Sequence, residues 1–244
     1  MFLTQLFSDA LLTIVYPQVC VICFGSVEQR RFGFACDSCW SATTVFNGAE
    51  TICWKCGRLS EAANLPAQQQ EIRCRHCDSQ WFTAARAIGL YEGALRESVL
   101  LLKRQPHLSG HLEELLITTA TRVPLNNVTR VIPVPLHAER VRTRGFNQAS
   151  IIAHALSKSL QLPLDEVSLV RVSATEKYRA GLDAKGRQDT VAGAFEVCYT
   201  RLVENEHILL TDDVFTTGAT VSGCAEALIN AGARSVFVLT LARA

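Results

Sequence analysis

The sequence predicts a parallel α/β sheet flanked by helices and preceded by a small cysteine-rich domain with two zinc sites. Four CxxC pairs fall in the first 77 residues, and apolar runs alternate with helical periods after Phe82. A late segment adds a strand, two acids, a loop and a helix. Strands interleaved with helices favour a parallel sheet. We expect an N-terminal part at residues 1–82 and a larger domain at residues 83–244.

The composition is that of a folded, water-soluble protein. The chain has 244 residues, 48% of them hydrophobic, and a formal charge of +1, which suits one full domain plus a small one. The apolar start, MFLTQLFSDALLTIVYP, opens without a basic cluster, carries Asp9 and is too short to span a bilayer. We expect a docking helix there, with a membrane-surface role as the alternative, and a cytoplasmic protein that could touch the inner membrane face.

Eight of the ten cysteines form the four CxxC pairs. One such turn points two thiolates at an ion, and two turns complete the tetrahedron that zinc accepts. Pairing consecutive turns gives loops of 12 and 17 residues, so two successive zinc ribbons are the economical arrangement, while a cross-braced pairing stays open. Redox pairs and iron–sulfur binding are alternatives, but a redox pair needs no fourfold repetition. The expected zinc ligands are Cys20, Cys23, Cys36, Cys39, Cys53, Cys56, Cys74 and Cys77.

The charge balance argues against a protein that grips a nucleic-acid backbone. Residues 1–82 hold six Lys and Arg against seven Asp and Glu, and two zinc–thiolate centres would bring the total to about −5. Residues 83–244 hold 18 basic against 16 acidic residues, too few for strong nonspecific DNA binding unless the arginines cluster. Any role in DNA handling is therefore expected to run through a protein partner.

Some residues near the cysteines have both a structural and a functional interpretation. The three tryptophans could stack bases, but beside zinc turns such residues more often cover the metal site. His76 stands between two thiols of one pair and is expected to be exposed. Cys198 and Cys224 lack partners in spacing and are expected in the core. The tryptophans are Trp40, Trp54 and Trp81.

The larger domain can be followed along the chain as alternating elements. An apolar run is followed by two helical periods, then by a short strand, a helix, a polar segment, a second strand with its helix, and a last strand. Helix periods are expected at 94–104, 111–123 and 148–160, and strands at 131–135, 208–212 and 235–242.

The segment ILLTDDVFTTGAT, residues 208–220, carries the clearest chemistry. Its apolar start suits a buried parallel strand, so the acids fall at the carboxyl end of that strand, where ligands of such sheets bind. The loop beyond supplies N–H groups, hydroxyls and a glycine, and it leads into a helix N-terminus. A phosphate on the loop and a sugar diol on Asp212 and Asp213 would use these groups.

These residues also carry a resemblance. ILLTDDVFTTGAT resembles the phosphoribosyl-pyrophosphate (PRPP) motif of type I phosphoribosyltransferases. VIPVPLHAERVRTRGFNQAS, residues 131–150, and GLDAKGRQDTVAGAF, residues 181–195, resemble segments of the ComF family of competence-associated, phosphoribosyltransferase-like proteins. A double zinc ribbon before the transferase domain is also similar to that family, so the likeness covers nearly the whole chain.

The resemblance implies roles for particular positions. Asp212 and Asp213 would hold the ribose hydroxyls, and Arg140 and Arg144, with Arg142 between them, would face a pyrophosphate bound with Mg²⁺. A solvated basic turn is the alternative for these arginines, and Asn147 with Gln148 could be a helix cap and first turn. The 5-phosphate would lie on Thr216, Thr217, Gly218, Ala219 and Thr220.

The chain also departs from the family pattern. Arg179 stands where the family often has Gln, and Thr190 stands where it often has Asn, so the second substrate is in doubt. Purine-salvage relatives carry an acidic residue at the place of Thr216, so a 6-oxopurine acceptor is not supported.

Two classes of function follow. The first is an enzyme that transfers a phosphoribosyl group from PRPP, with Mg²⁺, to an unidentified acceptor. The second is a binding module that senses PRPP or a nucleotide, or supports DNA uptake in competence through partners. A Walker-type hydrolase is disfavoured, because no GK[ST] follows a glycine loop.

Overall fold

A four-stranded parallel sheet forms the centre of the protein, as the sequence predicts. The computed structural model describes residues 17–60, 72–172 and 193–244. In these residues the strand order is β1-β6-β5-β2, and all neighbouring pairs are parallel. The strands are β1 (Ala84–Leu90), β2 (Arg130–Pro133), β5 (His207–Phe215) and β6 (Ser235–Arg243).

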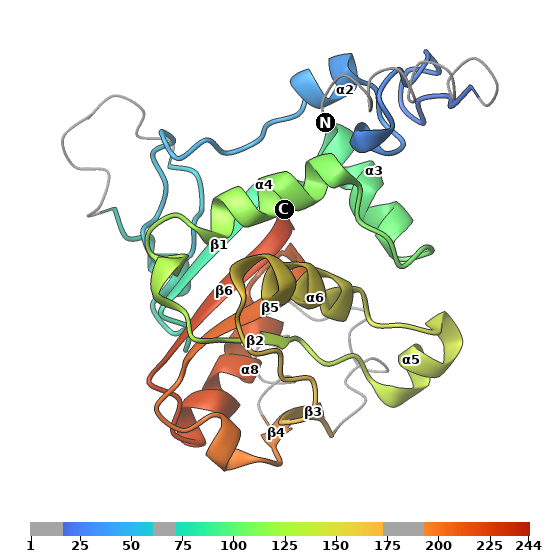
Figure 1. The fold of residues 1–244 in the computed structure, drawn as a ribbon. Helices are drawn as coiled ribbons and strands as arrows, with labels where there is room; N and C mark the ends of the chain where they lie inside the picture. The colour runs from blue at the N-terminus through green and yellow to red at the C-terminus, as the bar shows by residue number, and fades with distance from the viewer. Residues whose placement is uncertain (1–16, 61–71, 173–192) are drawn as a thin grey trace, which may run out of the picture.

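Helices cover both faces of this sheet, which explains the nearly continuous apolar runs of its central strands. Leu209 of β5 packs into the core beneath α3, α4 and α6, while Ile208 and Leu210 pack into the core beneath α8 (Figure 1). This alternation is what the pleat of a strand imposes. The helices are α3 (Gly93–Leu102), α4 (Gly110–Ala120), α6 (Gln148–Leu160) and α8 (Ala219–Asn230).

Several elements differ from the expected ones. The basic segment after β2 forms a helix, α5 (Ala138–Arg144), and two short antiparallel strands, β3 (Leu169–Arg171) and β4 (Phe195–Val197), lie outside the main sheet. Strand β5 runs three residues beyond Asp212 to Phe215, where it still pairs with β6. The departures at Arg179 and Thr190 lie outside the described residues. Short 3-10 turns occupy Arg30–Phe32, Arg75–Cys77, Leu125–Asn127 and Thr200–Leu202.

The cysteine-rich part forms two units, which pack at different places. The first unit, with its short helix α2 (Asp37–Ser41), contributes Phe32 and Trp40 to the core shared with α3 and α4. The second unit contributes Cys53 and Cys77 to the core on the α8 side of the sheet. Both units therefore pack against the larger domain, whose proposed start at residue 83 falls one residue before β1.

Candidate functional site

The predicted strand, loop and helix form one continuous segment at the carboxyl edge of the sheet. Strand β5 ends at Phe215, and α8 begins at Ala219 behind the exposed Thr216 and Thr217. Gly218 has a φ of +80°, and a Cβ there would lie 2.7 Å from Cζ of Phe215, so only glycine fits. The first amides of α8 have no partner within the helix and point out of its N-terminus, as an anion site requires.

The two acids lie near the end of β5. Oδ1 of Asp212 accepts a hydrogen bond from the Asp213 N–H at 2.9 Å, and Oδ1 of Asp213 accepts one from the Val214 N–H at 2.9 Å. Oδ2 of Asp213 lies 3.1 Å from Nζ of Lys103, just beyond the end of α3. Asp213 is therefore held by an ion pair from the α3 face of the sheet.

The environment of Asp212 opposes its ionisation. Burial raises the pKa of this carboxyl well above its usual value, and the adjacent Asp213 raises it further, while Lys103 acts in the opposite direction. A cation or hydroxyl donors that stabilise the charged form would relieve this cost. The acid pair is thus suited to a ligand that brings hydroxyl groups or a divalent ion.

Lys103 was missed by sequence reasoning. It follows the apolar run of the α3 period and looks like an ordinary polar residue at a helix end. Its role comes from the packing of α3 beside β1 and β6, which carries its ammonium group to β5. No local sequence pattern marks such a contact, although it joins residues 110 positions apart.

The arginines predicted for a pyrophosphate follow β2, the strand next to β5. They lie on helix α5 rather than on a solvated turn, and Arg140 and Arg142 are exposed. Arg144 is partly buried and donates to Oε1 of the buried Gln148. The carboxyl edge of the sheet therefore has basic side chains after β2 and acids at the end of β5.

Asn147 caps α6, which bears out its interpretation as a cap. Its Oδ1 accepts from the Ala149 N–H at 3.1 Å, and its Nδ2 donates to the Val134 carbonyl at 3.0 Å. Gln148 is the first residue of the helix. The RGFN segment thus fixes α6 to the end of β2.

Each cysteine unit brings four thiols together, and consecutive CxxC turns pair as the economical arrangement predicts. Within each group the sulfur atoms lie within 4.8 Å of one another. The Sγ–Sγ distances include 3.7 Å for Cys20–Cys39 and 3.4 Å for Cys56–Cys74. Four thiolates about 2.3 Å from one zinc ion stand roughly 3.8 Å apart, so both groups fit the ion. The cross-braced pairing is ruled out by this grouping.

Thiol ionisation also fits metal binding. Burial opposes ionisation of Cys20 and Cys53, but hydrogen bonds from backbone N–H groups outweigh it and hold each pKa at about 6. Burial and neighbouring thiols raise the pKa of Cys39 to about 12 and that of Cys56 to about 11. Without a cation, each unit would carry thiols that resist ionisation, and a metal ion removes that cost.

The single residues named near the cysteines and in the larger domain differ in burial. Trp40 is buried and donates through Nε1 to the Phe32 carbonyl, so it covers the first unit as expected. Cys224 is buried, but Cys198 is exposed and its prediction as a core residue is wrong, because it follows the edge strand β4. The residues exposed near the second unit are Trp54, His76 and Trp81.

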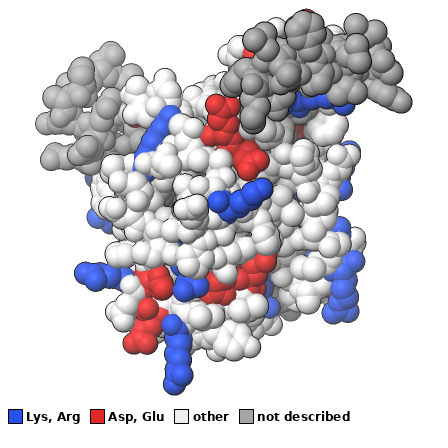
Figure 2. Space-filling view, viewed as in Figure 1, with Lys and Arg blue, Asp and Glu red and all other residues white. Residues whose placement is uncertain are grey.

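Charges of both signs are interspersed on the face shown in Figure 2, which carries no continuous basic surface among its described residues. Among the described helices, none has the length and apolarity that crossing a membrane would require.

Two curated proteins are similar in sequence to 94% of this chain. A protein named DNA utilization protein YhgH, from Escherichia coli K12, is 29% identical over 242 residues, which cover 94% of this chain and 99% of that protein. Competence protein ComFC of Bacillus subtilis is 25% identical over 248 residues, 94% of this chain and 96% of that protein. This chain is a homologue of the ComF proteins.

A further ComF relative matches locally, and two solved structures match distantly. Competence protein F of Haemophilus influenzae is 36% identical over 118 residues, 47% of this chain and 50% of that protein. A glutamine PRPP amidotransferase from B. subtilis has a TM-score of 0.37 at 16% identity, covering 55% of this chain and 28% of that one. A hypoxanthine phosphoribosyltransferase from Staphylococcus aureus has a TM-score of 0.36 at 15% identity, covering 54% of this chain and 62% of that one. Structural matches this distant say nothing about what the chain binds. No protein-family model matches the chain.

Proposed function

We propose that the protein binds PRPP with Mg²⁺ at the carboxyl edge of the sheet and transfers its phosphoribosyl group to an unidentified acceptor. The observation that supports this most is the continuity of the β5–α8 segment. Two carboxylates and a glycine-dependent loop at a helix N-terminus lie within nine residues of one another. One molecule that carries both a diol and a phosphate would engage both features.

In this proposal, Asp212 and Asp213 accept hydrogen bonds from the ribose hydroxyls, and the Thr216–Thr220 loop holds the 5-phosphate. Arg144, with Arg140, faces the pyrophosphate. Mg²⁺ would supply positive charge to the departing pyrophosphate. The chain's own residues hold the sugar and its phosphate, while positive charge from α5 offsets the negative charge that develops on the leaving group.

Zinc has a separate place in the proposal. Two structural zinc ions would occupy the cysteine units and hold each unit against the core. Four thiolates would fill the coordination sphere of each ion, so no open position would be left for a reacting water molecule. Chemistry is therefore assigned to the β5–α8 segment rather than to the metal sites.

A second candidate is a binding module that senses PRPP or a nucleotide without turning it over. The specific observation in its favour is Thr216, which stands at the loop position where purine-salvage relatives carry an acidic residue. Without that carboxylate, the loop has no general base at this position. The relatives named for competence and DNA utilization support a role in DNA uptake, through a protein partner. Both candidates use the same PRPP site.

Titration calorimetry and a turnover assay test these candidates in sequence. Purified protein with Mg²⁺ is expected to bind PRPP with about one molecule per chain and to bind ribose 5-phosphate more weakly. Isotope-labelled PRPP incubated with acceptor mixtures then separates the enzyme from the module. Absence of PRPP binding by folded, zinc-loaded protein would rule out the enzyme and a PRPP sensor, and would leave only a module that senses a nucleotide.

A further inference from the structure

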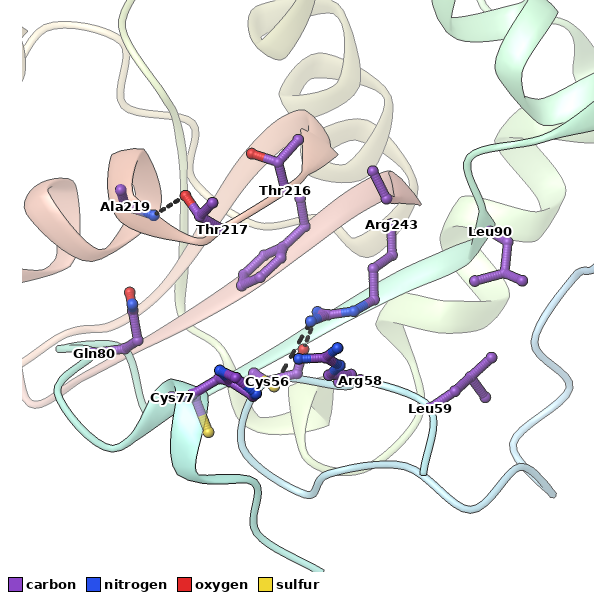
Figure 3. Close-up of a pocket in the computed structure, with 13 residues that line it drawn as sticks. Cys56, Arg58, Leu59, Cys77, Gln80, Leu90, Thr216, Thr217, Ala219 and Arg243 are labelled. Carbon is purple, nitrogen blue, oxygen red and sulfur yellow. Dashed lines mark hydrogen bonds between the residues drawn. The ribbon is translucent and has the colours of Figure 1, made fainter. Parts of the chain in front are cut away.

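A cavity of about 500 Å³ lies between the second cysteine unit and the start of α8 (Figure 3). One wall is the loop after β5, with Thr216, Thr217 and Ala219. The opposite wall comes from the second unit and includes Arg58 and Gln80. The floor is made by the ends of three neighbouring strands, β1, β6 and β5, so the cavity occupies the edge where ligands of parallel sheets bind.

Two arginines enter this cavity without a carboxylate partner among the described residues. Arg243, at the end of β6, donates to the Cys56 carbonyl at 2.5 Å and lies over the Phe215 ring at 4.6 Å. Arg58 is exposed and makes no ion pair with a described residue. Figure 3 shows the two guanidinium groups next to each other. Their mutual repulsion is a cost that an anion between them would remove.

Gln80 gives an independent sign of a missing ligand. Its side chain is 7% exposed, and Oε1 is buried without a hydrogen-bond partner among the described residues. The amide points toward the loop at the start of α8 (Figure 3), and Oε1 would lie 3.3 Å from a Cβ placed on Gly218. A buried amide oxygen without a partner is costly. A hydroxyl of the molecule that carries the oxyanion would give it one, whereas the oxyanion itself is an acceptor and would not.

We infer that this cavity binds a phosphate-class oxyanion between the N-terminus of α8 and the pair Arg58 and Arg243. Guanidinium groups bind such anions through charge-assisted hydrogen bonds, and the first amides of a helix bind them from the other side. The second cysteine unit is then a wall of the ligand site as well as a support of the fold. The inference rests on the proposed function only in placing a phosphate on this loop.

The oxyanion could come from two sources. It could be the 5-phosphate of the molecule whose ribose the acids hold, or a phosphate of a second molecule in the same cavity, whose volume exceeds that of one phosphate several times. The competing interpretation is that both arginines only balance the thiolate charge of the second unit, since Arg243 also lies 3.8 Å from Sγ of Cys56.

The test is calorimetric titration of zinc-loaded full-length protein with inorganic phosphate. The test variant is Arg58→Met, which removes an exposed charge and is expected to weaken phosphate binding roughly tenfold. Arg75→Met is the matched control, because Arg75 is an exposed arginine of the same unit that does not line the cavity. Zinc content and melting temperature are measured on each preparation, and both are expected to equal those of the wild type.

A repeat titration with saturating PRPP identifies the source. Competition by PRPP would assign the oxyanion to its 5-phosphate, and undiminished phosphate binding would assign it to a second molecule. Unchanged phosphate affinity in Arg58→Met, or an equal loss in Arg75→Met, would overturn the inference in favour of charge balance. A failure of the proposed function can be told apart from a failure of this inference, because Asp212→Asn and Asp213→Asn test the ribose contacts without touching either arginine.

Discussion

The two cysteine units share a motif and a thiol geometry but differ in what they contact. The first unit lies on helices: His111 of α4 packs edge-on against Phe32 and Trp40, with ring centroids 4.8 Å and 4.7 Å apart. Thr43, just after this unit, accepts a hydrogen bond from the Ala94 N–H at the start of α3. These contacts are aromatic or are hydrogen bonds to the helices of the core, as in a structural support, although Nδ1 of His111 is buried without a hydrogen-bond partner among the described residues.

The second unit lies on the strands and presents charged groups to a cavity. The Ala85 N–H donates to the Lys55 carbonyl at 2.6 Å, and Nζ of Lys55 donates to the Gln80 carbonyl at 2.7 Å. Arg86 of β1 donates to the Trp54 carbonyl at 2.9 Å. A repeated CxxC motif thus fixes the local thiol geometry, while its position on the sheet decides whether the unit can also line a ligand cavity.

The largest expected effect is on PRPP affinity, and it distinguishes the second cysteine unit from the first. Cys36→Ser and Cys74→Ser remove matched, partly buried thiols, one from each unit. Both variants should hold less zinc and melt earlier, because metal binding contributes to folding. If the oxyanion in the cavity is the 5-phosphate of PRPP, only Cys74→Ser should also lose PRPP affinity, by about a hundredfold, since two charged contacts from the cavity wall are disturbed.

Zinc analysis, melting curves and PRPP titration on the same preparations check this prediction. Equal losses of PRPP affinity in the two variants would remove the distinction between the units.

The next effect concerns the acids. Asp212→Asn and Asp213→Asn should each weaken PRPP roughly tenfold or more, because a neutral amide accepts a hydrogen bond less strongly than a carboxylate. Without ligand, Asp212→Asn should melt later than the wild type at neutral pH. The raised pKa of Asp212 means that its ionisation costs stability. This cost is absent below about pH 3.9, the pKa of an aspartate in the unfolded chain. It grows as pH rises toward and through the higher pKa of Asp212 in the folded protein.

Melting curves of the wild type and Asp212→Asn between pH 4 and pH 8 check whether the difference in melting temperature grows as pH rises. If the acids only capped the loop, the variants would melt earlier and still bind PRPP normally.

A smaller effect is expected at α5. Arg144→Ala should weaken PRPP several-fold to about tenfold, while ribose 5-phosphate, which has no pyrophosphate, should be affected much less. Lys158→Ala, an exposed charge removed from α6, serves as the control. Titration of both ligands checks this, and equal losses for the two would leave Arg144 with only its contact to Gln148.

The smallest effect concerns Lys103. Lys103→Met should lower the free energy of unfolding by about 1 kcal/mol at neutral pH, because the ion pair with Asp213 is only partly buried. Without this cation the pKa of Asp212 would rise further, so the loss should shrink as pH falls toward 4. Arg104→Met, an exposed neighbour, is the control in denaturant titrations. A loss that does not vary with pH would argue for packing instead of charge.

Much of this architecture could be predicted because it depends on residues close in the sequence. The thiol groups follow from CxxC spacing, and the strand, loop and helix of 208–230 follow from one apolar run and one glycine. Features that join distant segments could not be found this way. The pairing of Lys103 with Asp213 and the approach of Gln80 to Gly218 depend on how whole elements pack.

Two local errors have a similar cause. Cys198 resembles a core residue in composition, but only the position of β4 outside the main sheet shows that it is exposed. Strand β5 continues past the acids because β6 offers it partners as far as Arg243. Pairing of this kind is a property of the sheet rather than of either strand alone.

Hydrogen–deuterium exchange of zinc-loaded protein, with and without PRPP and Mg²⁺, can show whether the second cysteine unit shares the ligand site, because it reports on both units in one measurement. We expect protection at residues 216–222 and at residues 57–59 and 76–80 of the second unit, with no change at residues 20–39 of the first. Unchanged exchange at the start of α8 in PRPP-saturated protein would contradict the proposed site. Protection that included α8 but spared the second unit would confine the ligand to the β5–α8 segment.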